Sequence, residues 1–128
     1  MLSNKLDKKG ENMIPKIFES EYRFCLILWE NEPIKSANLA QICKEKLGWS
    51  RTTTYTVIKR LSDRGVVKNE KSIVSSVVSK EEVQTAEIDE LVKNKFNGSL
   101  PSFIATFTKN LNLSEEDIQE IRKIIDNE

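Results

Sequence analysis

The sequence predicts a mostly α-helical chain with one small β-hairpin, and three observations support this fold class. Apolar residues recur at helical spacing in six segments that follow one another from about residue 20 to the C-terminus. Between the third and fourth segments, the pattern changes to two short runs of β-branched residues separated by polar ones. A single glycine or proline stands at most of the breaks between segments, where helices are expected to stop.

The composition is that of a soluble globular protein. The chain has 128 residues, 38% hydrophobic and 31% charged, enough for one ordinary domain or two small ones. No apolar run approaches the roughly 20 residues that span a bilayer, and the first residues lack the apolar stretch of a secretory signal. We therefore expect a cytoplasmic protein with no membrane partner, in which Cys25 and Cys43 are small buried hydrophobes.

Enzymatic activity is not expected, because the residues that most often carry it are missing. The chain contains no histidine, which removes the commonest general base and a frequent metal ligand. Its four glycines stand singly, so the sequence holds no glycine-rich phosphate loop. The sequence therefore predicts no catalytic residues, no metal site and no small-molecule cofactor.

The formal net charge is zero, but the charges are unevenly distributed along the chain. Residues 14–78 hold 11 Lys or Arg against 7 Asp or Glu, a net charge of +4. Residues 79–128 hold 6 against 11, a net charge of −5. This division favours a basic first part that faces a polyanion and an acidic second part with another task; random scatter of charges is the alternative.

Two helices are predicted ahead of the most distinctive segment. Residues 1–12 carry no pattern and are expected to form a flexible tail, so the first domain is placed at residues 13–78. The first helix covers residues 21–31 and ends before Pro33, and Ser36 is expected to cap a second helix that ends at Gly48. The residues expected to face inward are Tyr22, Cys25, Leu26 and Trp29, then Leu39, Ala40, Ile42, Cys43 and Leu47.

The segment from Gly48 to Gly65 predicts a helix with two chemically different faces. Its run of β-branched residues would alone prefer a strand, but Ser50 as a cap, Gly65 as a stop and the helical spacing favour a helix. No acidic residue occurs between Glu45 and Asp63, so the polar face suits the phosphates and base edges of a DNA major groove. The core face is Thr54, Val57, Ile58 and Leu61, and the polar face is Thr52, Tyr55, Thr56 and Lys59, flanked by Arg51 and Arg60.

The flanks of this helix predict a winged helix-turn-helix domain. Only three residues separate it from the preceding helix, which is helix-turn-helix spacing. After it, the β-rich runs 66–68 and 73–78 are joined by a polar turn expected at residues 69–72, which predicts a hairpin or wing. Lys68 and Lys71 lie where a wing reaches DNA, although two solvated turn lysines would give the same pattern.

Residues 79–128 predict a separate three-helix domain. Ser79 and Glu82 form a capping box, and Ser99 and Ser114 are placed to cap two further helices. The helix that starts after Ser79 is expected to bury Val83, Ile88, Leu91, Val92 and Phe96. Three amphipathic helices in about 50 residues enclose little core alone, so we expect a dimerisation domain that packs against a second copy. An intramolecular helical cap on the winged helix is the alternative.

From about Ile14 to the end, the chain resembles the BlaI/MecI/CopY penicillinase-repressor family. The resemblance is carried by four segments in order: IPKIFESEYRFCLILWE, GWSRTTTYTVIKRLSDRGVV, KFNGSLPSFIATF and LSEEDIQEIRKIID. It implies a homodimeric repressor that binds inverted-repeat operators in double-stranded DNA, controls antibiotic-resistance genes, and is relieved by proteolysis or another signal. A winged-helix protein–protein docking module without DNA binding is the alternative function.

The resemblance also implies site residues and partners. A membrane sensor metalloprotease cleaves known members at an Asn-Phe bond. The equivalent pair here is Thr106-Phe107, so this chain departs from the family pattern at the first residue of the cleaved bond. The copper-responsive branch carries C-terminal cysteine motifs, which this chain lacks. The DNA-binding residues expected are Arg51, Thr52, Thr53, Tyr55, Thr56, Lys59, Arg60, Lys68 and Lys71, and the dimerisation residues expected are Leu91, Phe96, Phe103, Ile104, Phe107, Ile118, Ile121 and Ile125.

Overall fold

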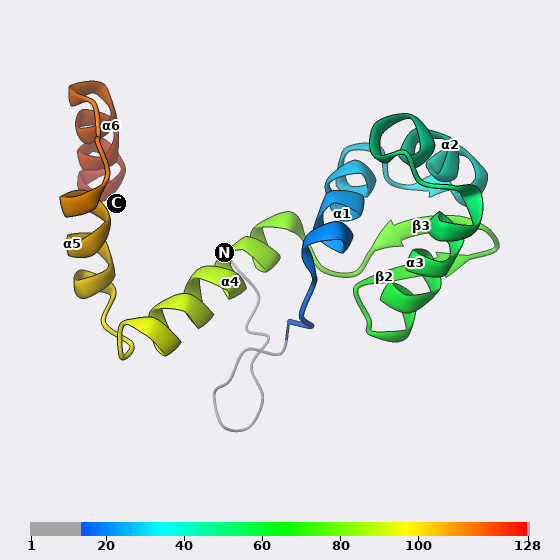
Figure 1. Ribbon diagram of the computed structural model, residues 1–128, viewed down its shortest axis with the longest axis horizontal. Coiled ribbons are helices and arrows are strands. Elements are labelled where there is room, and N and C mark those ends of the chain that lie inside the picture. The colour runs from blue at the N-terminus through cyan, green and yellow to red at the C-terminus, as the bar shows by residue number, and fades with distance from the viewer. Residues whose placement is uncertain (1–13, 128) are drawn as a thin grey trace. The chain divides into compact units, whose positions relative to one another are not determined.

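The computed structural model describes residues 14–127 (Figure 1). These residues divide into two compact units between Glu87 and Ile88. The tail predicted at residues 1–12 therefore lies outside the described residues. Among the residues that are described, no helix has the length and apolar content needed to cross a membrane.

The predicted fold class, mostly helical with a small hairpin, is confirmed. The first unit holds three helices, three short strands and the start of a fourth helix, and the second holds the rest of that helix and two more (Figure 1). The elements are α1 (Glu19–Asn31), β1 (Ile34–Lys35), α2 (Ser36–Leu47), α3 (Arg51–Asp63), β2 (Val67–Glu70), β3 (Ile73–Ser76), α4 (Lys80–Lys95), α5 (Leu100–Asn110) and α6 (Glu115–Asp126).

The strands form one antiparallel sheet in the order β1-β3-β2. The predicted four-residue turn is wrong, because β2 continues through Glu70, which pairs with Ile73. The turn is only Lys71 and Ser72, whose φ angles of 52° and 67° belong to the tight type I′ turn that matches strand twist. The sequence prediction also missed β1, in which Ile34 pairs with Val74. Two residues are too few to show a periodic pattern.

The core of the first unit lies between α1, α2, α3 and the sheet. In α1 the predicted inward face is only partly right, because Phe24, Ile27 and Leu28 are buried together with Cys25. The predicted Tyr22, Leu26 and Trp29 are half-buried. The helix is apolar on nearly every side, so the spacing of its apolar residues does not select one face. The remaining buried apolar core residues of the unit are Ile17, Leu39, Ala40, Cys43, Val57, Ile58, Leu61, Val66, Val67, Val74, Val78 and Val83.

The turn between α2 and α3 is closed by backbone hydrogen bonds. Gly48 has a φ of 72°, and its N–H donates to the Lys44 carbonyl at 3.1 Å, so α2 ends where the sequence predicted. Trp49 then packs its ring against Phe24, with the centroids 6.1 Å apart. The predicted Ser36 cap is wrong: Ser36 is the first helical residue, and its N–H donates to the Ser72 carbonyl at 2.8 Å.

The helices of the C-terminal half begin at the predicted caps. Ser79 and Glu82 exchange hydrogen bonds of 2.9 and 3.0 Å, which confirms the capping box before α4. The Ser99 and Ser114 side chains accept N–H groups at the starts of α5 and α6. Along α4, Val83 and Val92 are buried as predicted.

Two residues of α4 that the sequence predicted to be buried are exposed in the second unit. Ile88 is 50% exposed and Leu91 41% exposed, so the prediction that both are buried is wrong for a single chain. In α5 and α6, all of whose residues are described, none is buried. The two helices leave their apolar faces open to solvent.

Candidate nucleic-acid interface

Helix α3 is built as predicted from Gly48–Gly65. The Ser50 side chain accepts the Thr53 N–H at 3.1 Å and caps the first turn. At the other end, Gly65 has a φ of 80°, and the Val66 N–H donates to the Leu61 carbonyl at 2.9 Å. The predicted core face is confirmed, with Thr54, Val57, Ile58 and Leu61 all buried.

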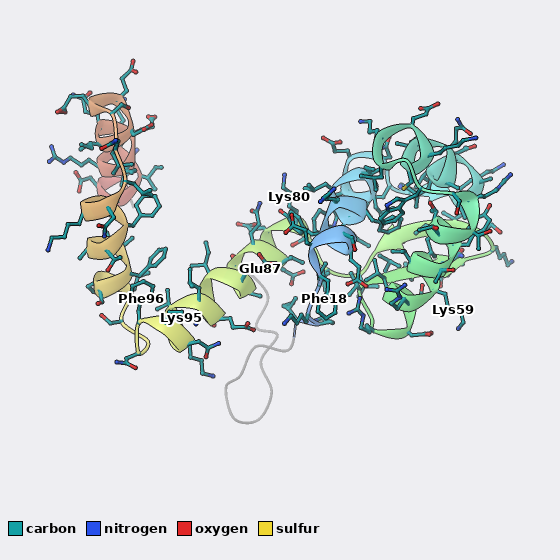
Figure 2. The ribbon with its side chains drawn as sticks, in the orientation of Figure 1. Phe18, Lys59, Lys80, Glu87, Lys95 and Phe96 are labelled. Carbon is teal, nitrogen blue, oxygen red and sulfur yellow. The ribbon has the colours of Figure 1, made fainter. Side chains whose placement is uncertain are left out.

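The opposite face of α3 is exposed and rich in hydrogen-bond donors. Arg51 and Tyr55 form one unit at its start: the Arg51 Nε donates to the Tyr55 hydroxyl at 3.0 Å, and the guanidinium lies 5.7 Å from the ring centroid. Lys59 stands on the outer surface (Figure 2), 78% exposed, and its amine is 3.5 Å from the Asp63 carboxylate. Such an exposed pair is weak and leaves the amine available to another anion. The other exposed residues of this face are Thr52, Thr53, Thr56 and Arg60.

A hollow of about 580 Å³ lies between α2 and the start of α3. Lys44 of α2 and Arg51 of α3 supply its two cations, and no acidic side chain lines it among the residues that the structure describes. Nothing in the sequence marks this contribution from α2, because Lys44 stands beside Glu45 and Lys46 in an ordinary charged stretch. The other lining residues are Ala37, Asn38, Ala40, Gln41 and Ser50.

The C-terminal end of α3 contacts α1 through a buried carboxylate that no pattern in the sequence indicated. Glu21 is 2% exposed and faces Arg64 Nη2 at 2.5 Å and Arg60 Nη1 at 3.7 Å. Burial alone would raise the pKa of Glu21, but the hydrogen bonds from Arg64 and the Phe18 N–H, with the charges of both arginines, lower it overall. Glu21 is therefore an ionised group inside the fold.

The wing lysines are both exposed. Lys71 occupies the turn of the hairpin, and Lys68 on β2 lies 3.8 Å from the Glu70 carboxylate. Neither amine is held in a buried ion pair among the described residues. The structure thus leaves both lysines free to meet a phosphate.

The two cysteines are buried core thiols, as predicted. Burial raises the pKa of Cys25 to about 12, and the nearby Glu21 charge adds to the rise. Burial also raises the pKa of Cys43, and the Thr54 hydroxyl offsets part of that rise. Among residues 14–127, no group of three or more His, Cys, Asp or Glu side chains gathers in a way that would hold a metal ion.

The second unit carries an apolar groove between α5 and α6, with a volume of about 530 Å³. The predicted dimerisation residues Ile104, Ile118, Ile121 and Ile125 line it. Phe103 is partly covered by Phe96 and Phe107, whose ring centroids lie 5.4 and 6.2 Å away. Leu91 is exposed on α4. Thr106 and Phe107 are both exposed within α5.

These features define the class of protein. Three helices, a three-residue turn before the third, and a β-hairpin directly after it make a winged helix-turn-helix, here followed by a helical unit. The exposed third helix is the element that enters a DNA groove in proteins of this class.

The chain belongs to the penicillinase repressor family, whose sequence model matches residues 17–127. It is therefore a transcriptional repressor and a DNA-binding protein of the BlaI/MecI type. The methicillin resistance regulatory protein MecI of Staphylococcus aureus is 24% identical over 119 residues, which cover 90% of this chain and 97% of that protein. The penicillinase repressor of Bacillus licheniformis is 22% identical over 117 residues, 88% of this chain and 91% of that protein.

Proposed function

We propose that this chain is a homodimeric, sequence-specific repressor that binds an inverted-repeat operator with α3 in the major groove. The observation that carries the proposal is the exposed face of α3, which presents donors and no carboxylate before Asp63, while the opposite face is locked into the core. Docking to another protein would not require this face to be free of carboxylates.

The residues of the interface divide by their chemistry. Thr52 and Thr53 supply hydroxyls in the first turn of α3, and Tyr55 and Thr56 supply hydroxyls in its second turn. All four hydroxyls are proposed to reach base edges. Thr53 has less freedom, because its hydroxyl lies 2.9 Å from that of Ser50. The cations are proposed to bind phosphates and set the register of α3 on the duplex; these are Arg51, Lys59 and Arg60 on α3, Lys68 and Lys71 on the wing, and Lys44 beside the α2–α3 hollow.

The second unit is proposed to pair two copies of the chain. Its apolar groove and the exposed Ile104, Ile121 and Ile125 offer a surface that a second copy covers by two-fold symmetry. A two-fold dimer presents two α3 helices, and this arrangement matches an inverted repeat with half-sites one helical turn or a multiple apart.

The genes controlled are proposed to be antibiotic-resistance genes, because the relatives are named for methicillin resistance and penicillinase. Relief of repression is proposed to follow from loss of the second unit or of its pairing. Thr106 and Phe107 lie exposed on α5, where cleavage by a membrane sensor protease would divide that unit.

A gel-shift titration against the DNA upstream of the chain's own gene, with random DNA of equal length as competitor, tests the repressor function. We expect binding at least 1,000-fold tighter to the upstream DNA, a typical ratio for specific repressors. Equal affinity for both DNAs would contradict the proposal and would favour the alternative function, docking to another protein without DNA binding.

Two substitutions on α3 separate base reading from phosphate binding. Thr56→Ala is expected to weaken operator binding and leave random DNA unaffected, because it removes a hydroxyl but no charge. Lys59→Ala is expected to weaken both DNAs alike and to reduce the slope of log K against log salt by about 1. If the two variants behave identically, the division between hydroxyls and cations is wrong.

A further inference from the structure

A buried carboxylate lies beneath the C-terminal end of α3, and none of the proposed DNA contacts uses it. The Glu21 side chain, in the first turn of α1, is only 2% exposed. Its Oε1 accepts the Phe18 N–H at 2.9 Å, and its Oε2 faces two arginines that project from the end of α3. A buried charge is stable only when it is paired, so the charges of these two arginines stabilise the buried Glu21 carboxylate.

The two arginines are held differently. Arg64 is 29% exposed, and its Nη2 lies 2.5 Å from Glu21. Its Nη1 donates to the Lys16 carbonyl at 3.2 Å, and its guanidinium lies 5.5 Å from the centre of the Phe18 ring. Figure 2 shows Phe18 in the segment that leads into α1. Arg64 is therefore held by Glu21, the Lys16 carbonyl and the Phe18 ring, and it balances the Glu21 charge.

Arg60 keeps most of its donors free. Its side chain is 57% exposed and approaches Glu21 only through Nη1, at 3.7 Å. A guanidinium has five N–H donors in a planar fork, so it binds one carboxylate along one edge and a phosphate along another. Arg60 lies nine residues beyond Arg51, about 13 Å along the helix at 1.5 Å per residue, so the two arginines are too far apart to bind the same phosphate.

We propose that Glu21 is a positioning residue for DNA binding. Its charge attracts the Nη1 group of Arg60, 3.7 Å away, and so orients the guanidinium with its remaining donors toward a phosphate beyond those contacted by the start of α3. The inference rests on the proposed DNA-binding function and extends it to a residue of α1 that does not itself touch DNA.

A double-mutant cycle on operator binding tests this role, using Glu21→Gln, Arg60→Gln and the double variant, with affinities measured from about 50 to 200 mM salt. Each single variant is expected to bind the upstream DNA about tenfold more weakly, because each loses the charge-assisted hydrogen bond from Arg60 to a phosphate. Each is also expected to reduce the salt slope by about 0.9, which corresponds to one phosphate contact. The double variant is expected to match either single variant, because both changes remove the same contact.

Asp63→Asn is the matched control. Asp63 is also an acid paired with a cation of α3, but it is 65% exposed and its partner Lys59 is 78% exposed. Exposed pairs hold side chains weakly, so the affinity and salt slope of this variant are expected to equal those of the unmodified chain. A wild-type slope in Glu21→Gln, or additive losses in the double variant, would overturn the positioning role.

Circular dichroism and a thermal melt establish whether Glu21→Gln folds. If it does not fold, the DNA affinity of Arg60→Lys is the test of the proposal. This exposed position tolerates the change, and lysine keeps the charge without the planar fork. The proposal expects Arg60→Lys to bind more weakly with a shallower salt slope, and wild-type binding would refute it. Failure of the unmodified chain to prefer its upstream DNA would instead refute the repressor proposal itself.

Discussion

The two units of this chain treat their apolar residues in opposite ways. In the first unit, Phe24, Leu28, Leu39 and Leu61 are completely buried between the helices and the sheet. In the second, Ile104, Ile124 and Ile125 remain 46 to 73% exposed, although α5 and α6 are as well capped as any helix of the first unit. Good caps therefore fix where a helix begins, but a core requires more surface than these helices provide.

The difference has a consequence for how each unit is stabilised. The first unit satisfies its own core, so its stability is expected not to depend on protein concentration. The second leaves an apolar groove open, and burial of about 25 cal/mol per Å² is available only when another surface covers it. Association is thus expected to contribute stability to the second unit alone.

Leu28→Ala is expected to have the largest effect, since Leu28 is completely buried in the first unit. Removing its side chain leaves a cavity and is expected to lower the free energy of unfolding by about 3–4 kcal/mol. Urea denaturation at two protein concentrations measures the loss, which should be the same at both. Leu26→Ala, half-buried on the same helix, is the control and should lose clearly less.

Ile125→Glu is expected to break the pairing of the second unit. Ile125 lines the apolar groove, and a charge there would be buried without a partner, so self-association should weaken by about 3 kcal/mol, more than 100-fold. Sedimentation equilibrium measures the dissociation constant. Ile124→Glu is the matched control, because Ile124 is 73% exposed and does not line the groove. Equal losses of self-association in both variants would show that the groove is not part of the dimer interface.

Glu21 is expected to make the stability of the first unit depend on acid. Its pKa in the folded chain is lowered from the ordinary 4.5, because the arginine contacts outweigh burial. The folded state therefore binds its proton less readily than the unfolded state, and this contribution is complete above pH 4.5 and is lost as the pH falls through the lowered pKa. Thermal melts between pH 7 and 3 should show a steeper loss in the unmodified chain than in Glu21→Gln. Parallel curves would contradict this.

Thr54→Val is expected to have the smallest effect, and it is a gain. The Thr54 hydroxyl is completely buried, and the only group that the described residues offer it is the Cys43 thiol, a weak hydrogen-bond partner. Valine has nearly the same shape without this poorly satisfied hydroxyl, so the free energy of unfolding should rise by about 1 kcal/mol. Thr52→Val, on the exposed face of the same helix, should give no gain and should weaken operator binding. A loss of stability in Thr54→Val would show that the contact between the Thr54 hydroxyl and the Cys43 thiol stabilises the fold by more than burial of the hydroxyl costs.

Much of the fold was predictable because single residues determine where its helices begin and end. Ser50, Ser79, Ser99 and Ser114 each cap the helix that the sequence assigned to them, and Gly65 ends α3. These residues act through local hydrogen bonds or backbone angles, which a sequence displays directly.

The mistakes lie where no single residue marks the structure. The turn at Lys71 and Ser72 adopts positive φ without the usual glycine or asparagine, so nothing local marked it as two residues long. Ser36 does not cap α2, because Lys35 just before it is the last residue of β1 and the Ser36 N–H donates to the Ser72 carbonyl of the hairpin turn. Glu21 looked like an ordinary acid in the first turn of a helix, and only the fold brings the end of α3 above it.

The central claim is that the second unit pairs two winged helices so that two α3 helices read DNA together. The most direct measurement compares operator affinity for the footprinted upstream site with the same site carrying 5 extra base pairs between its half-sites, about half a helical turn. We expect two chains per duplex on the natural site and at least a 100-fold weaker affinity on the lengthened one, where only one α3 can engage. Equal affinity for both DNAs, or one chain per duplex, would contradict the account.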